Sequence, residues 1–284
     1  MKPSIQMKAR RTVLGATLAV ALGFMGMSSA YAQSVDSIKK SGVLKAGAQV
    51  AQVPWGFTDA SGKLTGFDIE FIELLAKDLG VKAQITPVTS SNRVAALLTG
   101  QVDMLAAVMG IFPDRQKVVL FSRPYATNEN VLIAKASVPD MKGWDDLKGM
   151  RIGVPRGTPQ DNAVTAAKAG ATIQRFDDDA TTVQALISGQ VDVIGAAITQ
   201  VNNIAQAAGP GKYAAKLTLQ RAFNGAAVRP TEREWVNYIN DFVSRKLASG
   251  ELNALFKKWI GVDLPKSMPT TGEGEAPLPV IVTK

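Results

Sequence analysis

The sequence predicts an α/β protein made of two similar lobes. Segments with strand-like and helix-like hydrophobic patterns alternate along the chain, which is typical of α/β proteins with largely parallel sheets. One helix-to-strand unit also occurs twice: Leu97-Leu98-Thr99-Gly100-Gln101-Val102-Asp103-Met104 returns as Leu186-Ile187-Ser188-Gly189-Gln190-Val191-Asp192-Val193. In both copies a helix ends at glycine and a strand begins at Val-Asp. The repeat therefore indicates two lobes of one design.

The first lobe is expected to begin with residues 33–127, in which the hydrophobic spacing and the glycine stops define each element. Its predicted elements are a strand over 43–48, a helix over 67–79 ending at Gly80, a short helix over 94–99, a strand from Val102 to Val108 and a helix opened by Pro113.

The second lobe is expected to span residues 128–220, starting with a strand over 151–154 that resembles the first strand of the chain. Two helices predicted over 232–247 and 252–259 have no further strand pattern beside them. We therefore expect residues 221–262 to return to the first lobe. Residues 263–284 contain four prolines and two glycines, which predicts an irregular or disordered tail.

Residues 1–32 differ in composition from the rest of the chain. They carry four cations and no acid, then an apolar run from Val13 to Met27, then Ala30-Tyr31-Ala32. The run has 15 residues, whereas a helix that crosses a bilayer needs about 20. We interpret residues 1–32 as a cleaved secretory signal peptide, which predicts export to the periplasm. Arg10-Arg11 leaves open whether export uses the general secretory or the twin-arginine route.

The composition excludes several kinds of chemistry. The 284 residues include no Cys and no His, so there is no Ser-His-Asp or Cys-His catalysis, no thiolate or imidazole metal site and no disulfide. Carboxylate chemistry remains possible. The net charge of +8 includes the four cations of residues 1–32, and no Lys/Arg block stands out. We expect a monomer with no nucleic-acid partner, no cofactor and no metal.

Two loop-to-helix junctions, one in each lobe, are suited to binding a small anion. In the first, Pro113 starts a helix and Arg115 lies in its first turn; in the second, Thr158 can cap a helix that starts at Pro159. Backbone N–H groups and the positive end of a helix dipole attract carboxylates, and an arginine lies beside each junction. Alternatively, Thr158 only caps a helix and Arg115 is a surface charge.

The chain resembles the bacterial extracellular solute-binding proteins of family 3, the periplasmic polar amino-acid receptors of ABC importers. The resemblance runs from Gly42 to Gly261 and rests on several motifs together. They are Gly66-Phe67-Asp68-Ile69-Glu70-Phe71, Pro54-Trp55, Ser90-Ser91-Asn92-Arg93, Asp114-Arg115, Phe121-Ser122-Arg123-Pro124-Tyr125, Gly157-Thr158 and the two Gly-Gln-Val-Asp copies. The resemblance implies a type II periplasmic-binding-protein fold, in which two α/β lobes joined by a two-strand hinge close over one ligand.

The resemblance also assigns candidate ligand-binding residues. It implies that Arg115 and Thr158 hold a ligand α-carboxylate, and that Ser90 and Arg93 reach the side-chain carboxylate of an acidic ligand. Arg93 could equally pair with an acid on its own lobe. Trp55 is expected either in the cleft wall or in the core.

The chain departs from the family pattern at several positions. Gly110 replaces a hydroxyl residue, and Ala197 replaces the acid that holds the ligand ammonium in most relatives. Gln49 and Gln52 replace the acid and the tyrosine of basic-amino-acid receptors. A free ammonium in a dry cleft without acceptors would be costly, so Lys, Arg and His are not expected ligands, and it stays open whether the ligand carries an α-amino group.

Together, these features predict a periplasmic receptor, not an enzyme, that captures a small carboxylate-bearing solute for an ABC permease. The solute is an amino acid, which can be acidic, or a related organic acid. The alternative is a periplasmic dehydratase of the same fold that acts on a cyclic carboxylate resembling prephenate or arogenate. Such an enzyme needs an acid in the cleft, and the expected pocket positions carry none.

Overall fold

A computed structural model describes residues 35–273 of the chain. The predicted signal peptide, residues 1–32, lies outside the described residues, as does the part of the predicted tail from 274 to 284. Within the described stretch, no helix combines the length and the apolar character that crossing a bilayer would require.

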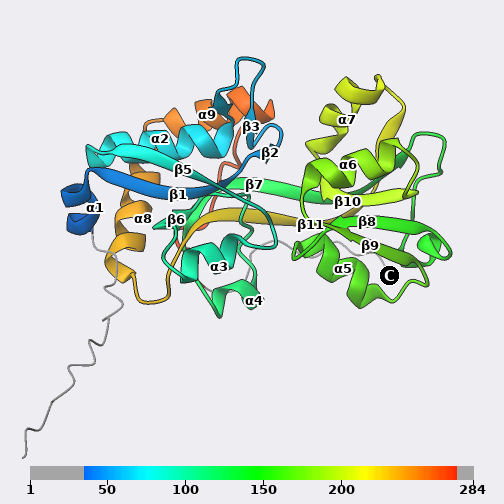
Figure 1. Cartoon of the computed structure of the whole chain (residues 1–284), viewed down its shortest axis with the longest axis horizontal. Helices are drawn as coiled ribbons and strands as arrows, with labels where there is room; N and C mark the ends of the chain where they lie inside the picture. Colours follow the sequence, from blue (N-terminus) through cyan, green and yellow to red (C-terminus); the bar gives the residue numbers. More distant parts are fainter. Residues whose placement is uncertain (1–34, 274–284) are drawn as a thin grey trace, which may run out of the picture. The chain divides into compact units, whose positions relative to one another are not determined.

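The main feature is one eight-stranded mixed sheet with the order β5-β1-β6-β11-β7-β10-β8-β9 (Figure 1). Its strands are β1 (Val43–Gln49), β5 (Lys82–Val88), β6 (Met104–Leu105), β7 (Leu120–Lys135), β8 (Arg151–Pro155), β9 (Thr172–Phe176), β10 (Val193–Ala197) and β11 (Tyr213–Val228). A small second sheet contains β2 (Ala51–Gln52), β3 (Gly56–Thr58) and β4 (Leu64–Thr65).

The helices are α1 (Val35–Ser41), α2 (Phe67–Leu79), α3 (Arg93–Leu98), α4 (Pro113–Gln116), α5 (Pro159–Ala167), α6 (Asp179–Ile187), α7 (Gln200–Ala208), α8 (Arg233–Ala248) and α9 (Glu251–Ile260), with a short 3₁₀ helix η1 (Trp144–Leu147). The predicted helix over 67–79 is confirmed residue for residue. The predicted start of α5 is confirmed too: Pro159 is its first residue, and Thr158 caps it by accepting a hydrogen bond from the Asp161 N–H.

The two long antiparallel strands β7 and β11 pass through the middle of the sheet and connect two groups of elements. We call α1–α4, β1–β6, α8 and α9 the first lobe, and β8–β10 with α5–α7 the second lobe. The predicted fold class, two α/β lobes joined by two strands, is confirmed. The predicted lobe boundaries fall inside β7 and β11 and stay a prediction, since those strands belong to both lobes.

The ladder between β7 and β11 is not uniform. Its register shifts between Ala215 and Leu217, between Thr218 and Gln220, and on both sides of Gly225, while the stretch from Gln220 to Asn224 is regular. Such irregularities bend a strand locally and increase its twist.

The repeated Gly-Gln-Val-Asp motif has the same role in each lobe. Gly100 and Gly189 each have a φ of 77°, in the left-handed region that ends a helix. The Asp103 carboxylate accepts the Lys45 N–H at 2.9 Å, and the Asp192 carboxylate accepts the Arg151 N–H at 2.9 Å. Each aspartate thereby ties the start of one strand to that of its neighbour, which explains why the motif recurs.

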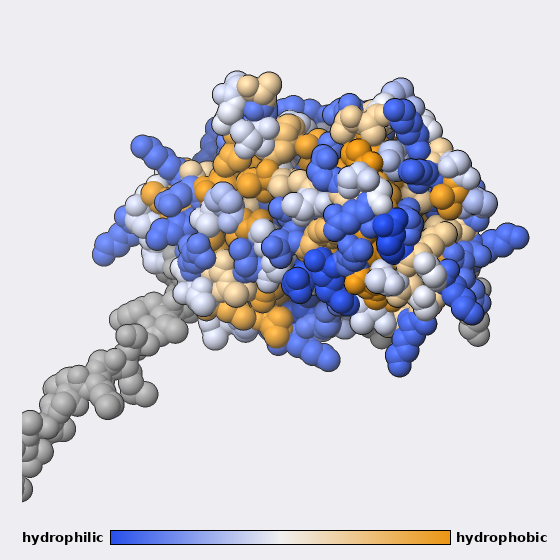
Figure 2. All heavy atoms as spheres, turned by 45° about the vertical axis from the view of Figure 1, so that its right-hand side comes forward, coloured by the Kyte–Doolittle hydropathy of each residue, from blue (hydrophilic) through white to orange (hydrophobic). Residues whose placement is uncertain are grey.

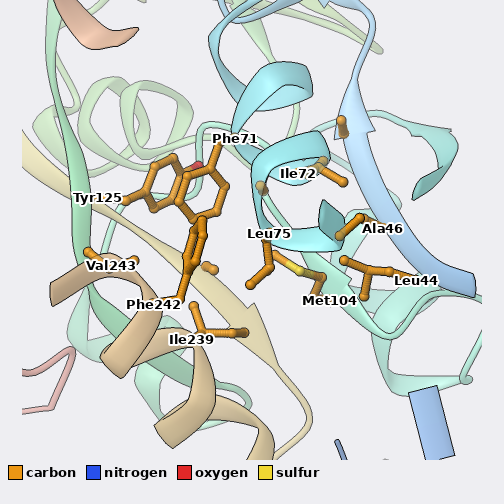
Figure 3. Close-up of a cluster of buried hydrophobic side chains, with 14 of the residues drawn as sticks. Leu44, Ala46, Phe71, Ile72, Leu75, Met104, Tyr125, Ile239, Phe242 and Val243 are labelled. Carbon is orange, nitrogen blue, oxygen red and sulfur yellow. The ribbon is translucent and has the colours of Figure 1, made fainter. Parts of the chain in front are cut away.

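Hydrophobic clusters cover both faces of the sheet in each lobe. In the second lobe, α6 and α7 pack on one face and α5 on the other (Figure 1). In the first lobe, α1, α2, α8 and α9 share the largest cluster, part of which is enlarged in Figure 3. There the Tyr125 ring stacks on Phe71 with centroids 4.2 Å apart, and Phe242 meets Phe71 edge-on. On the face seen in Figure 2, hydrophobic and hydrophilic residues are interspersed.

The predicted strand from Val102 to Val108 is wrong in extent, because only Met104 and Leu105 are in β6. The strand ends at Leu105, and three residues later Val108 has a φ of 51°, which is rare for a β-branched residue. The Val108 N–H donates to the buried Asp68 carboxylate at 2.8 Å, and that carboxylate also accepts the Tyr125 hydroxyl at 2.7 Å. These contacts stabilise a turn at Val108. The alternation of apolar and polar residues along the sequence could not predict this turn.

Residues 263–273 contain no helix or strand, yet they pack along the first lobe. Leu264 is buried in the largest cluster, and Met268 packs against both clusters of the lobe. The Gly272 carbonyl accepts the Gln116 side-chain amide at 2.8 Å. The described part of the tail is thus irregular and is attached to the first lobe at a few points, while most of its residues are exposed.

Candidate functional site

A small cavity lined by residues of both lobes lies between them. Its wall comes from the end of β1, the loops around α3 and β6, the first turns of α5 and α6, and the strands β7 and β11. Among the candidates from the sequence, six line this cavity: Gln49, Gln52, Ser90, Arg93, Gly110 and Thr158. The other three, Arg115, Trp55 and Ala197, do not line it.

Arg93 provides a buried positive charge on the first-lobe side of the cavity. It is the first residue of α3, 2% exposed, and its guanidinium donates to the Ala107 carbonyl at 2.5 Å. Burial, together with the nearby charge of Arg115, lowers the pKa of Arg93 to about 9. Gln49 and Ser90 lie on the same side and bond to each other at 2.7 Å.

Arg115 is a second buried cation, located behind the cavity wall. Its guanidinium donates to the carbonyls of Gly110 in the first lobe, at 3.2 Å, and of Gly157 in the second, at 3.3 Å. Burial lowers the pKa of Arg115 to about 10. In the described part of the chain, these hydrogen bonds of Arg93 and Arg115 end on backbone carbonyls rather than carboxylates, so an anion would be a better partner for both.

Gly110 and Thr158 are held close to Arg115. A Cβ at Gly110 would come within 2.5 Å of the Phe112 ring, so a larger residue here requires that ring to move. The Thr158 hydroxyl donates to the Pro155 carbonyl at 2.7 Å and accepts the Asp161 N–H at 3.2 Å. The Thr158 side chain therefore caps α5 while the residue lines the cavity.

Asp179 is a cavity residue that the sequence analysis missed. It is 3% exposed at the start of α6 in the second lobe, and its carboxylate lies 3.5 Å from the Gln52 side-chain nitrogen of the first lobe. Burial raises the pKa of Asp179 to about 7, against the opposing effect of the Arg93 charge. In the run Asp177-Asp178-Asp179, Asp178 caps α6; sequence alone does not distinguish the capping acid from the one that faces the cavity. The positions expected to line the pocket carry no acid, but the cavity contains one at Asp179, a position that was not among them.

Carboxamide side chains form much of the remaining wall, and these were also missed. They are Asn128 and Asn130 on β7, Asn224 on β11 and Gln160 on α5. The spacing of Asn128 and Asn130 places both on one face of a strand, a signal that could have been used had β7 been predicted. Four buried atoms of this wall have no hydrogen-bond partner in the described structure: Gln52 Oε1, Asn128 Oδ1, Gln160 Oε1 and Asn224 Nδ2.

Trp55 and Ala197 are core residues. Trp55 is fully buried, packs edge-on against Phe67 with centroids 5.6 Å apart, and donates its indole N–H to Thr199 Oγ1 of the second lobe at 3.3 Å. Ala197 is buried in β10, where it pairs with Asn130 of β7. Trp55 is thus packed among core residues, but it also lines a second pocket with Thr199 of the second lobe and Phe256 of the first, so both alternatives stay predictions.

The lobes contact each other around the cavity. In addition to the bonds of Gln52, Trp55 and Arg115, Gln200 of the second lobe donates to the Val53 carbonyl of the first at 3.3 Å. Among the described residues, no group of three or more Asp and Glu side chains is arranged to hold a metal ion. The site thus combines two buried guanidinium groups, one buried carboxylate and several amides, which suits a small polar ligand.

Comparisons with known proteins agree with this architecture. The L-cystine-binding protein TcyJ of Escherichia coli (strain K12) is 30% identical over 259 residues, covering 90% of this chain and 97% of that protein. The crystal structure of a solute receptor for L-cysteine from Neisseria gonorrhoeae is 26% identical, with a TM-score of 0.75 over 80% of this chain and 94% of that one. An ancestral amino acid-binding protein, described as a precursor of cyclohexadienyl dehydratase, is 30% identical, with a TM-score of 0.72 over 79% of this chain and 98% of that one.

The family comparison covers both lobes and the strands that connect them. The model of the bacterial extracellular solute-binding proteins, family 3, matches residues 44–262. That range contains every residue described above as lining the cavity between the lobes. The chain therefore belongs to the bacterial extracellular solute-binding proteins of family 3.

Proposed function

We propose that this protein captures an amino acid in the cavity between its lobes and delivers it to the transmembrane subunits of an ABC importer. The observation that carries the proposal is the pair of buried guanidinium groups, Arg93 and Arg115, which interact electrostatically with each other and donate to backbone carbonyls. Two like charges in a buried site repel each other, and a ligand carboxylate would relieve that repulsion.

In this proposal, the ligand carboxylate binds on the first-lobe side, near Arg93 and Ser90. Arg115 contributes to carboxylate binding because its guanidinium lies between the carbonyls of Gly110 in the first lobe and Gly157 in the second. A carboxylate that reaches Arg115 would compete with the two carbonyls, and a charge-assisted bond is roughly twice as strong as a neutral one. The residues that would surround the carboxylate thus come from both lobes.

Capture and closure are coupled in this scheme. A ligand that contacts both lobes binds the closed arrangement more tightly than an open one, and so it shifts the population towards closure. The existing hydrogen bonds between the lobes are few and long, between 3.3 and 3.5 Å. Such bonds contribute little alone, which leaves the equilibrium under the control of the ligand.

Cystine and cysteine are the first ligands to test, because the relatives named above bind them. Acidic amino acids follow, since Arg93 and Arg115 offer two positive charges. The signal peptide proposed for residues 1–32 would deliver the protein to the periplasm, where an importer collects its solute.

The decisive experiment is isothermal titration calorimetry of the purified protein with L-cystine, L-cysteine, L-glutamate, L-glutamine and L-arginine, after a thermal-shift screen of all common amino acids. We expect saturable one-to-one binding of at least one amino acid and an increase in melting temperature with its concentration. If every amino acid leaves both the heat signal and the melting temperature unchanged, the proposal is overturned.

A dehydratase remains a second candidate because of Asp179. A buried carboxyl group with a pKa raised to about 7 can donate a proton to a leaving hydroxyl group at neutral pH. The structural neighbour described as a dehydratase precursor adds to this candidate. Incubation with prephenate and arogenate, followed by ultraviolet detection of the aromatic products, separates the two functions. Sustained turnover would favour the enzyme, and recovery of intact substrate the receptor.

A further inference from the structure

The lining of the cavity contains buried hydrogen-bond acceptors that have no donor in the described structure. Gln52 Oε1 and Gln160 Oε1 are both buried and have no partner in the described structure. Leaving a buried acceptor without a donor costs free energy, so such atoms in a native site indicate an absent partner. These two oxygens come from different lobes and line the same cavity.

Asp179 adds a negative charge to these acceptors. Its carboxylate lies 3.5 Å from the Gln52 side-chain nitrogen, and it is as deeply buried as the two glutamines. Arg93 is the cation that acts on it electrostatically, and no ion pair joins the two side chains in the described structure. A buried carboxylate with no close cation is costly unless a ligand supplies one.

The donor that fits these acceptors is a primary ammonium group. An ammonium group carries one positive charge and three N–H donors, which can be shared between a carboxylate and two amide oxygens. The resemblance to the family implies an acid at the position of Ala197 for this purpose. Here that position is an alanine in the core of the sheet, so the missing carboxylate would have to come from another element.

We infer that Asp179, together with the side-chain oxygens of Gln52 and Gln160, forms the ammonium subsite of this receptor, so that its ligands must carry a free amino group. This inference rests on the proposed function. It also implies that one bound ligand lies between Arg93 at its carboxylate end and Asp179 at its ammonium end, which requires both lobes.

The test uses matched ligand pairs that differ only in their amino groups. We would titrate L-cystine against 3,3′-dithiodipropionate and L-glutamate against glutarate by calorimetry. The variants are Asp179→Asn and, as control, Asp177→Asn. Asp177 is an exposed acid two residues away, whose ion-pair distance to Arg156 is 4.0 Å.

For the amino acid that binds, we expect the parent protein to prefer it over its deaminated partner by about 30-fold or more, the effect of losing one partner of a buried charge pair. Asp179→Asn should remove most of this preference by weakening the amino acid alone, and Asp177→Asn should leave it unchanged. Far-ultraviolet circular dichroism would verify that both variants are folded.

The outcomes separate the two claims. If an amino acid binds but its deaminated partner binds equally well, or if Asp179→Asn weakens both partners by the same factor, the ammonium subsite is wrong and the receptor function stands. If no amino acid binds the parent protein, the proposed function is overturned and the subsite with it.

Discussion

At the scale of single residues, Arg93 and Arg115 are expected to have different roles in binding a carboxylate. Arg93 lines the cavity, whereas Arg115 bridges Gly110 and Gly157 behind the wall. Both are buried, and both retain donors suited to an anion. The free energy of ligand binding should therefore depend on each of them, and the cost of losing either should exceed that of an exposed arginine.

Replacing Arg115 with alanine should weaken ligand binding by about 2–5 kcal/mol, because a buried charge-assisted contact is lost. Folding should change little, since the guanidinium forms hydrogen bonds to two carbonyls only. Calorimetry with the ligand that emerges from the screen measures the effect. Arg156→Ala is the matched control, as that side chain is largely exposed. Equal affinities of the parent and Arg115→Ala would show that Arg115 does not contribute to ligand binding.

Asp179 should make the ligand-free protein less stable as pH rises. Its pKa is raised from 3.8 to about 7 in the folded state, so the folded protein binds the proton more tightly than the unfolded chain does. The contribution of this group to the free energy of unfolding is therefore greatest below pH 4 and falls as pH increases to about 7. The cause is burial of the charged form.

Asp179→Asn should remove this dependence. The variant should match the parent near pH 4 and exceed its free energy of unfolding by up to about 4 kcal/mol near pH 8, since one pKa unit corresponds to about 1.4 kcal/mol. Urea denaturation across this pH range measures the difference. A constant difference between the two proteins at all pH values would contradict the assignment. The ligand-binding residue is thus expected to lower the stability of the empty receptor.

At the scale of elements, α5 links helix capping to the cavity, because Thr158 both caps the helix and lines the wall. Thr158→Ala should lower the free energy of unfolding by about 1 kcal/mol, the usual loss when a capping hydroxyl is removed. Thr158→Ser keeps the hydroxyl and should retain most of the stability. Urea denaturation of both variants tests this, and an equal loss in the serine variant would indicate that the methyl group, not the cap, is responsible.

Elements with strong local signals could be predicted from the sequence. The helix over 67–79 has apolar residues at regular spacing and ends at Gly80, and α5 has Thr-Pro at its start, so local chemistry sufficed. The extent of β6 could not be predicted, because the turn at Val108 depends on a hydrogen bond to Asp68, forty residues earlier in the chain. Tertiary contacts of this kind leave no local pattern.

The candidate site was predicted in part for the same reason. Gln49, Ser90 and Arg93 follow strands or start helices, where side chains that face a cavity are expected in α/β proteins. Asp179 was missed because the residue before it, Asp178, is also an aspartate at the start of α6. The sequence does not show which of the two caps the helix and which faces the cavity. The asparagines of β7 were missed because the strand itself was not predicted from the sequence. Without the strand, the alternation of its residues could not show which side chains face the cavity.

At the scale of the whole molecule, closure can be followed without interference from native thiols, since the sequence contains no cysteine. Ser61→Cys in the first lobe and Ala207→Cys in the second provide exposed attachment points for a donor and an acceptor dye. We expect ligand to increase energy transfer between the dyes, because it favours the closed arrangement. A pair within the first lobe, Ser61→Cys with Ala248→Cys, should show no change. Equal responses of the two pairs would contradict closure between the lobes.

The irregular ladder between β7 and β11 has a mechanical consequence. The register is regular from Gln220 to Asn224, with a shift at each end, and this regular stretch carries the cavity residues Ala222 and Asn224. If bending is concentrated at the shifts, the stretch between them acts as a stiff platform with a joint on either side. The ligand would then bind to a rigid stretch of the two strands, while each lobe rotates about the bend on its own side. Recognition of the ligand and motion of the lobes would thus be assigned to different parts of the same two strands.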